Sequence, residues 1–316
     1  MVAYGELIRE VRLSKGLTQK EVYTGIISKS YAIGFEKGKH DITLVLFEEI
    51  LKRVMLSSDE FFFMNRGYSL AEEDNFWYKF AHAANQTSLK ELQALHNEVL
   101  QQKGERANLR EAIVHSRIEI QEQFLLNNKF DVSIVSKEDK EVIQTYLWKV
   151  QSWTLEEIRI FANSVDYFDE DVQIYFFQLV LKSIEKYKHY DRGKKVFSTL
   201  LTNITEELIA RNQLDYATQL LEILYELSAS HDCAFYRIMH NYYQGLIWMK
   251  SEQVELGYNK SKGAIEILDT LGYESLALLY QTLFTQFLEK EQIQKRIRTQ
   301  SRNLQSVRHN AKTTAD

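Results

Sequence analysis

Apolar residues recur at the three- and four-residue spacing of helices along most of the chain. In residues 4–15, for example, Leu7, Ile8 and Val11 share one face, and Arg9 and Arg12 are assigned to the other. The 316 residues include no proline, which would break helix interiors and interrupt such a pattern. The sequence therefore predicts an all-α protein.

The stretch from Thr18 to Gly38 has the pattern of a helix-turn-helix. Thr18 and Ser28 stand before two short helical runs, over about residues 18–26 and 28–37, where their hydroxyls can accept hydrogen bonds from unpaired amides. Four apolar positions would pack the two helices together: Val22, Ile26, Ala32 and Phe35. The positions that remain on the outside are Lys29, Ser30, Tyr31, Gly34 and Lys37. A recognition helix presents such residues to the major groove of DNA.

The local charge agrees with this interpretation. The whole chain has a net charge of −5, but residues 9–39 contain seven Lys or Arg and three Glu, so a positive footprint is confined to this segment. We predict base or backbone contacts by Lys29, Ser30, Tyr31 and Lys37, and mostly phosphate contacts by Arg9, Arg12, Lys15 and Gln19. The alternative for each residue is a solvated helix face.

Two further helices complete a five-helix domain over residues 1–65. One starts near Thr43 and carries an apolar stripe of Leu44, Phe47, Ile50 and Leu51. The other is capped at Ser57 or Ser58 and contains three consecutive phenylalanines, Phe61, Phe62 and Phe63. We interpret this triplet as core and as an anchor to the next domain, rather than as a ligand site.

Residues 66–290 are predicted to form a second domain of helical repeats. After about residue 169, helices recur in pairs at intervals of about 40 residues, which is typical of a tetratricopeptide-like α-solenoid of helical hairpins. Residues 255–272 fit that repeat best, with Gly263 and Ala264 where neighbouring helices would approach closely. A solenoid buries its interfaces by stacking and leaves a concave surface for binding.

Residues 4–63 also carry a family resemblance. The segments GLTQKE (16–21), SKS (28–30) and FEKGK (35–39) resemble Xre-type helix-turn-helix domains and, more narrowly, the Rgg/MutR regulators of streptococcal type. The resemblance implies a homodimeric transcription regulator that binds double-stranded DNA and, through its repeat domain, a short peptide pheromone of quorum sensing. RNA polymerase is a further candidate partner. The resemblance also gives Glu36, in FEKGK, a structural role.

Polar and aromatic residues of the repeats are candidates for holding that peptide. Asn can pair with a peptide backbone amide through both its donor and its acceptor, and Arg can bind a terminal carboxylate. The predicted peptide contacts are Tyr187, Asn203, Cys233, Phe235, Arg237, Asn241 and Tyr242. Repeat packing is the alternative role for each of them.

The sequence gives little support for an enzyme or a metal-binding protein. The chain has no glycine-rich phosphate loop, HExxH motif or GxSxG motif, and its histidines are scattered singly. The single cysteine, Cys233, excludes an intramolecular disulfide and fits a reducing compartment. We therefore expect no enzyme activity, cofactor or metal, and a cytoplasmic protein without membrane contact.

Two alternatives remain open. The basic segment 291–316 is expected to be a solvated terminus, with DNA contact as the other possibility. The repeat domain could instead dock a partner protein, with the helix-turn-helix used weakly or only for autoregulation.

Overall fold

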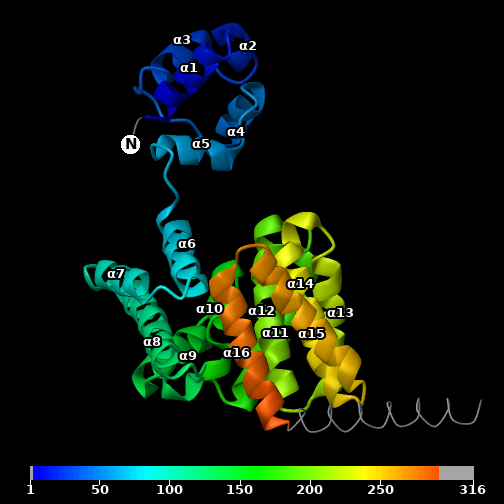
Figure 1. Ribbon diagram of the computed structural model, residues 1–316. Coiled ribbons are helices and arrows are strands. Elements are labelled where there is room, and N and C mark those ends of the chain that lie inside the picture. Colours follow the sequence, from blue (N-terminus) through cyan, green and yellow to red (C-terminus); the bar gives the residue numbers. More distant parts are fainter. Residues whose placement is uncertain (1–2, 292–316) are drawn as a thin grey trace, which may run out of the picture. The chain divides into compact units, whose positions relative to one another are not determined.

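The computed structural model describes residues 3–291, which form helices joined by turns, without a strand in that range (Figure 1). The chain divides into two compact units, Met1–Lys79 and Phe80–Asp316. The division falls within α6 (Glu72–Asn85), whereas the sequence placed it at residue 65. The predicted basic tail, apart from Glu291, lies outside the described residues.

The first unit contains the five predicted helices, followed by the first part of α6. Their bounds are α1 (Tyr4–Ser14), α2 (Gln19–Tyr23), α3 (Lys29–Phe35), α4 (Leu44–Arg53) and α5 (Ser58–Asn65). Thr18 and Glu21 form a reciprocal capping box at α2, and the Ser28 hydroxyl accepts a hydrogen bond from the Tyr31 amide at 3.3 Å. These caps confirm where the sequence placed the two helices of the helix-turn-helix.

The core of this unit differs from the prediction at a few positions. Phe61 is fully buried among the other apolar residues of the bundle, but Phe63 is exposed and packs its ring on Tyr68. Leu44, assigned to the apolar stripe of α4, is 66% exposed. It is the first residue of the helix and precedes the residues of α4 that pack into the core. Phe47, Ile50 and Leu51 are buried as expected.

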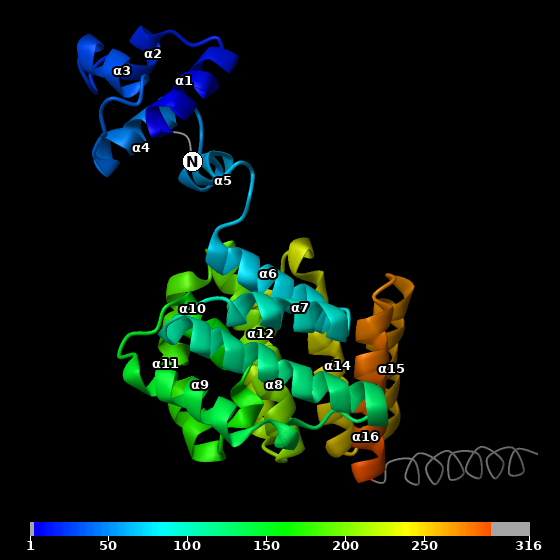
Figure 2. The same ribbon diagram turned by 90° about the vertical axis from the view of Figure 1, so that its left-hand side faces the viewer.

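The second unit is a series of antiparallel helices (Figures 1 and 2). Its α-helices are α7 (Leu89–Leu100), α8 (Glu105–Asn127), α9 (Lys137–Lys149), α10 (Leu155–Ala162), α11 (Glu170–Tyr187), α12 (Asp191–Ala210), α13 (Leu214–Leu227), α14 (Ala234–Lys250), α15 (Val254–Thr270) and α16 (Glu274–Lys290). Three short 3-10 helices interrupt them: η1 (Val132–Ile134), η2 (Val165–Tyr167) and η3 (His231–Cys233). From α12 to α16 each helix packs on the next, which confirms the predicted helical-repeat fold.

The hairpin of α14 and α15 is the tightest pair, and glycines make it possible. A Cβ on Gly245 would lie 2.5 Å from the Gly257 carbonyl oxygen, and one on Gly257 would lie 2.4 Å from the Gly245 carbonyl oxygen. The sequence assigned the close approach to Gly263 and Ala264. Ala264 is buried, but a Cβ on Gly263 would meet nothing within 4 Å, so the small residue that matters lies two turns earlier on α15.

None of the helices within residues 3–291 is both long and apolar enough to span a membrane.

Candidate functional sites

A buried carboxylate holds the first three helices together. Glu36, the residue that ends α3, accepts hydrogen bonds from Arg12 Nε at 2.6 Å and Arg12 Nη2 at 2.9 Å. Gln19 Nε2 donates to the same carboxylate at 2.7 Å, and the Tyr23 hydroxyl donates at 2.8 Å. Burial opposes ionisation of Glu36, but the donors Arg12, Gln19 and Tyr23 outweigh it and lower its pKa. The carboxylate is therefore charged and fully paired near neutral pH.

This network corrects part of the predicted DNA contact set. Arg12 is only 7% exposed and points inward to Glu36, so it is not available to a phosphate. Gln19 is half-buried, and its side-chain amide donates a hydrogen bond to the same carboxylate. The Lys15 ammonium donates to the carbonyls of Val54 and Met55, at 2.6 and 3.0 Å, because the unpaired carbonyls at the end of α4 attract a cation.

The remaining predicted residues lie on the outside of the unit. Lys29, Ser30, Lys37 and Arg9 are exposed. Tyr31 is 39% exposed, but its ring stacks on His40 with centroids 4.8 Å apart and its hydroxyl donates to the Asp41 carbonyl at 2.7 Å. Of the predicted DNA contacts, Lys29, Ser30 and Lys37, on or after α3, and Arg9, on α1, therefore lie on the surface.

Gly34, predicted to face outward, is buried. A Cβ at this position would lie 2.2 Å from a ring carbon of His40, so the His40 side chain occupies the space beside α3. The glycine lets the loop after α3 fold back onto the helix. Together with the contacts of Tyr31 to His40 and Asp41, it fixes that loop against α3.

The second unit contains a group of ionisable side chains in its interior, here called the interior polar cluster. Its members come from α8, η2, α12, α14 and α16: Arg117, Asp166, Tyr167, Glu206, Glu207, Tyr243 and Tyr280. The Tyr243 hydroxyl donates to Glu206 Oε2 at 2.8 Å. Burial raises the pKa of Glu206 to about 7, with a further contribution from Glu207. Burial also raises the pKa of Asp166 well above its usual value, and the charges of Glu207 and Glu206 add to this rise.

Two atoms of the interior polar cluster lack hydrogen-bond partners among the described residues. They are Arg117 Nε and Asp166 Oδ1, both shielded from solvent, although each side chain as a whole is half-buried rather than sealed. A buried polar atom without a partner costs free energy, and such atoms are rare in folded proteins. The cluster thus offers a donor and an acceptor to a ligand that can reach it.

Two of the predicted peptide contacts adjoin the interior polar cluster. Asn203 lies one helical turn before Glu206 on α12, and its amide donates to the Ala162 carbonyl at 2.6 Å. Tyr242 is buried, with its ring 5.1 Å from that of Tyr243 and 5.2 Å from that of Tyr280. Both residues therefore serve the packing around the cluster.

The structure does not gather the other predicted contacts there. The Arg237 guanidinium carbon lies 3.6 Å from the centroid of the Tyr225 ring, and Arg237 donates to the Tyr225 carbonyl at 2.7 Å. It therefore pairs with a carbonyl in the last turn of α13. Cys233 is buried at η3, and burial raises the pKa of its thiol, which disfavours a reactive thiolate. Three further residues lie at the end of α11 and on α14: Tyr187, Phe235 and Asn241.

The interior polar cluster could not be predicted from local sequence patterns because its members are distant in the chain. Arg117 and Tyr280 are more than 160 residues apart, and no helix contributes more than two members. The available signal was the presence of paired acids, Glu206 and Glu207, inside a long helix whose neighbouring positions are mostly apolar.

A family model described as "HTH-type transcriptional regulator Rgg, C-terminal domain" matches residues 93–282, more than half of the chain. The chain belongs to the Rgg family. This family is one of transcriptional regulators. The match, which lies in the repeat domain, confirms the family resemblance.

Solved structures agree with the Rgg assignment. A putative transcriptional regulator from Listeria monocytogenes is 54% identical, with 92% of this chain and 98% of that chain covered and a TM-score of 0.78. The pheromone receptor Rgg2 of Streptococcus dysgalactiae is 17% identical, with 90% and 99% covered and a TM-score of 0.66. The complex of PrgX with cCF10 is 16% identical, with the same coverage and a TM-score of 0.61. The last two similarities show the shared fold.

Proposed function

We propose that this Rgg-family protein is a sequence-specific DNA-binding regulator whose second unit binds a short peptide and thereby changes its DNA-binding or activating output. The proposal has two parts, a DNA half and a peptide half. The observation that supports the DNA half, which is sequence-specific DNA binding, is the exposed first turn of α3. Lys29 and Ser30 face outward there, while the Glu36 network fixes α3 against α1 and α2. A recognition helix contacts base edges with its amino-terminal residues, so these two are the favoured contacts.

The interior polar cluster supports the peptide half of the proposal. A peptide in extended form carries backbone amides and carbonyls that need partners once they leave water. Arg117 Nε and Asp166 Oδ1 lack partners, and the half-buried tyrosine Tyr167 beside them supplies apolar surface. The related receptor Rgg2 is described as a pheromone receptor, and PrgX is solved with cCF10, which makes a peptide the first ligand to test.

A dimer follows from the DNA half of the proposal. One small helix-turn-helix reads only a few base pairs, and two copies would need to reach half-sites about 34 Å apart. We assign the dimer contact to the second unit, and light scattering on the full chain at micromolar concentration would give the mass of two chains. A monomer under those conditions and in the presence of bound DNA would contradict this part.

The DNA half can be tested without knowing the operator. The full chain would be used to select duplexes from a random-sequence pool at low salt, and the bound fraction sequenced after several rounds. We expect an enriched inverted repeat with half-sites about one helical turn apart. Failure to retain any duplex at low salt would overturn the DNA half.

The peptide half needs a separate readout. The full chain would be incubated with a pool of synthetic peptides of about eight residues, and retained peptides identified by mass spectrometry. Wild type should retain specific sequences that Arg117→Gln loses, whereas Arg237→Gln should retain them. Retention of no peptide by a folded, DNA-binding chain would favour docking of a partner protein by the repeats instead.

A further inference from the structure

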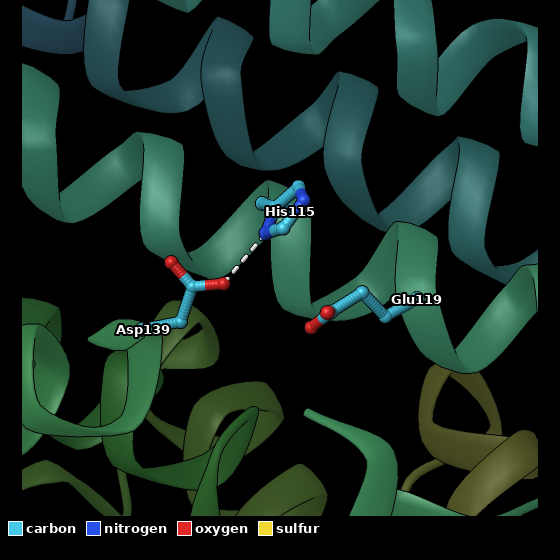
Figure 3. A group of neighbouring side chains, drawn as sticks. All are labelled: His115, Glu119 and Asp139. Carbon is cyan, nitrogen blue, oxygen red and sulfur yellow. Dashed lines mark hydrogen bonds and ion pairs between the residues drawn. The ribbon is translucent and has the colours of Figure 1, made fainter. Parts of the chain in front are cut away.

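Three side chains of metal-ligating type meet between α8 and the start of α9. They are His115, Glu119 and Asp139, and their donor atoms all lie within 4.8 Å of one another (Figure 3). His115 and Glu119 are one helical turn apart on α8, so they share a face. Asp139 lies in the first turn of α9 and points toward them. It is the one such group found within residues 3–291.

Hydrogen bonds of the backbone fix the Glu119 carboxylate and the turn that carries Asp139 independently of any ion. The Ser136 amide donates to Glu119 Oε2 at 3.0 Å, which fixes Glu119 against the start of α9. The Asp139 amide donates to the Ser136 hydroxyl at 3.1 Å, so the turn that carries Asp139 is capped through its backbone. The carboxylate of Asp139 is then left to His115, whose Nδ1 lies 2.7 Å from Asp139 Oδ2.

The imidazole is also oriented from its other side. The His96 ring, from α7, stacks on the His115 ring with centroids 5.7 Å apart and an angle of 30° between the planes. His115, Glu119 and Asp139 are each half-buried, so they are restrained by packing but remain within reach of solvent ions. Restraint of this kind lowers the ordering cost of binding a ligand.

We propose that His115, Glu119 and Asp139 bind a divalent transition-metal ion. One imidazole nitrogen and two carboxylate oxygens suit Zn²⁺, Mn²⁺ or Fe²⁺, whereas Ca²⁺ and Mg²⁺ prefer oxygen ligands alone. Ligand atoms on one such ion are about 3 to 3.5 Å apart at bond lengths of roughly 2.1 Å. The contact between His115 and Asp139 would therefore open by less than about 1 Å, and water would complete the coordination.

Binding would replace a proton by the ion. Metal ligands bind in their deprotonated forms, so the ion would compete with a proton at His115 and release it. The ion would join α8 to α9 close to the interior polar cluster. Burial raises the pKa of Tyr167 in that cluster, and the charges of Asp139 and Glu119 contribute to the rise, so the two sites are within electrostatic reach.

The test uses the full chain without a polyhistidine tag, freed of metal by a chelator. Titration with Co²⁺, followed by its visible absorption, should show one site per chain that Zn²⁺ displaces and excess Ca²⁺ does not. His115→Gln and Asp139→Asn should each weaken binding by at least about tenfold. His189→Gln, which removes an exposed histidine near the end of α11, should bind as wild type does.

The conservative variants separate a metal site from a plain ion pair. Asp139→Asn keeps the hydrogen bond from the backbone amide of residue 139 to the Ser136 hydroxyl. Glu119→Gln keeps a side-chain oxygen that can accept from the Ser136 amide. Both variants should therefore fold. Zn²⁺ should raise the melting temperature of wild type and of His189→Gln, but not that of a His115→Gln, Asp139→Asn double variant. Equal Co²⁺ affinity in wild type and the double variant, or no effect of Zn²⁺ on wild type, would overturn the proposal.

Discussion

The Arg12 guanidinium and the Glu36 carboxylate form a two-point hydrogen-bonded pair, at 2.6 and 2.9 Å, in the buried centre of the helix-turn-helix unit. The side chains are only 8% and 3% exposed, and they connect α1 to the end of α3. A two-point pair fixes both distance and orientation. The direction in which α3 presents Lys29 therefore depends on a contact that is buried inside the unit.

Replacing Arg12 by alanine should destabilise the first unit rather than weaken DNA contacts directly. Removing one partner leaves Glu36 buried with fewer donors, which costs about 3 to 5 kcal/mol for buried pairs. Hydrogen exchange of peptides from α1 to α3 in the full chain measures this local loss. Arg9→Ala, which removes an exposed arginine of the same helix, should change exchange by less than about 0.5 kcal/mol. Equal protection in the two variants would contradict the structural role of Arg12.

The same pair sets an acid limit for this unit. The pKa of Glu36 is lowered in the folded state, so its contribution to stability is complete above the ordinary carboxyl value near 4.5 and is lost as the pH falls through the lowered value. Between pH 7 and 5, wild type should keep a constant advantage over Glu36→Gln in local unfolding free energy. Below about pH 4.5 the advantage should shrink. An advantage that grows on acidification would show that Glu36 is not the charged member of the pair.

Two glycines of α15 should respond oppositely to the same substitution. Gly257→Ala places a methyl group 2.4 Å from the Gly245 carbonyl oxygen, so α14 and α15 must separate, at a cost of about 1 to 3 kcal/mol or more. Gly263→Ala meets no atom within 4 Å and lies inside the helix, where alanine is favoured by up to about 1 kcal/mol. Urea unfolding of the full chain would compare them. Destabilisation by both would mean that Gly263 also lies at a close contact.

The sequence predicted what depends on local pattern. The caps at Thr18 and Ser28, and the helical repeats expected after about residue 169, follow from residues within one or two turns. It did not separate Arg9 from Arg12, which are three residues apart on the same polar face. The partner that draws Arg12 inward is 24 residues away. His115 and Asp139 are equally distant, so their meeting depends on how α8 packs against α9.

Glu206 should make the second unit more sensitive to alkaline pH. Its pKa is raised to about 7 by burial, so the folded state holds this proton more tightly than the unfolded state does. The resulting stability is present below the ordinary value of 4.5 and is lost as the pH rises through 7. Glu206→Gln keeps an oxygen for the Tyr243 hydroxyl and removes the charge.

The expected result is a difference that depends on pH. In urea unfolding, Glu206→Gln should match wild type near pH 5 and exceed it in stability at pH 8. Glu222→Gln, the same substitution at an exposed position on α13, should show no stability difference from wild type that depends on pH. If Glu206→Gln were less stable than wild type at pH 8, the ionised form would be the one that the fold favours.

Removal of the Lys29 charge should weaken DNA binding, and the pattern of the loss should show whether Lys29 contacts a phosphate or a base. Lys29 is the first residue of the helix and is exposed, so it can reach a phosphate or a guanine edge. A phosphate contact predicts that Lys29→Ala weakens all duplexes alike and reduces the salt slope by about one, whereas a base contact predicts a loss of roughly 1 to 3 kcal/mol at one position of the site. Fluorescence anisotropy on the selected duplex and on scrambled versions, over a range of salt, distinguishes these outcomes. Lys262→Ala removes the same charge from an exposed position on α15 and should leave both quantities unchanged. Equal effects of the two substitutions would mean that net charge, and not the first turn of α3, accounts for binding.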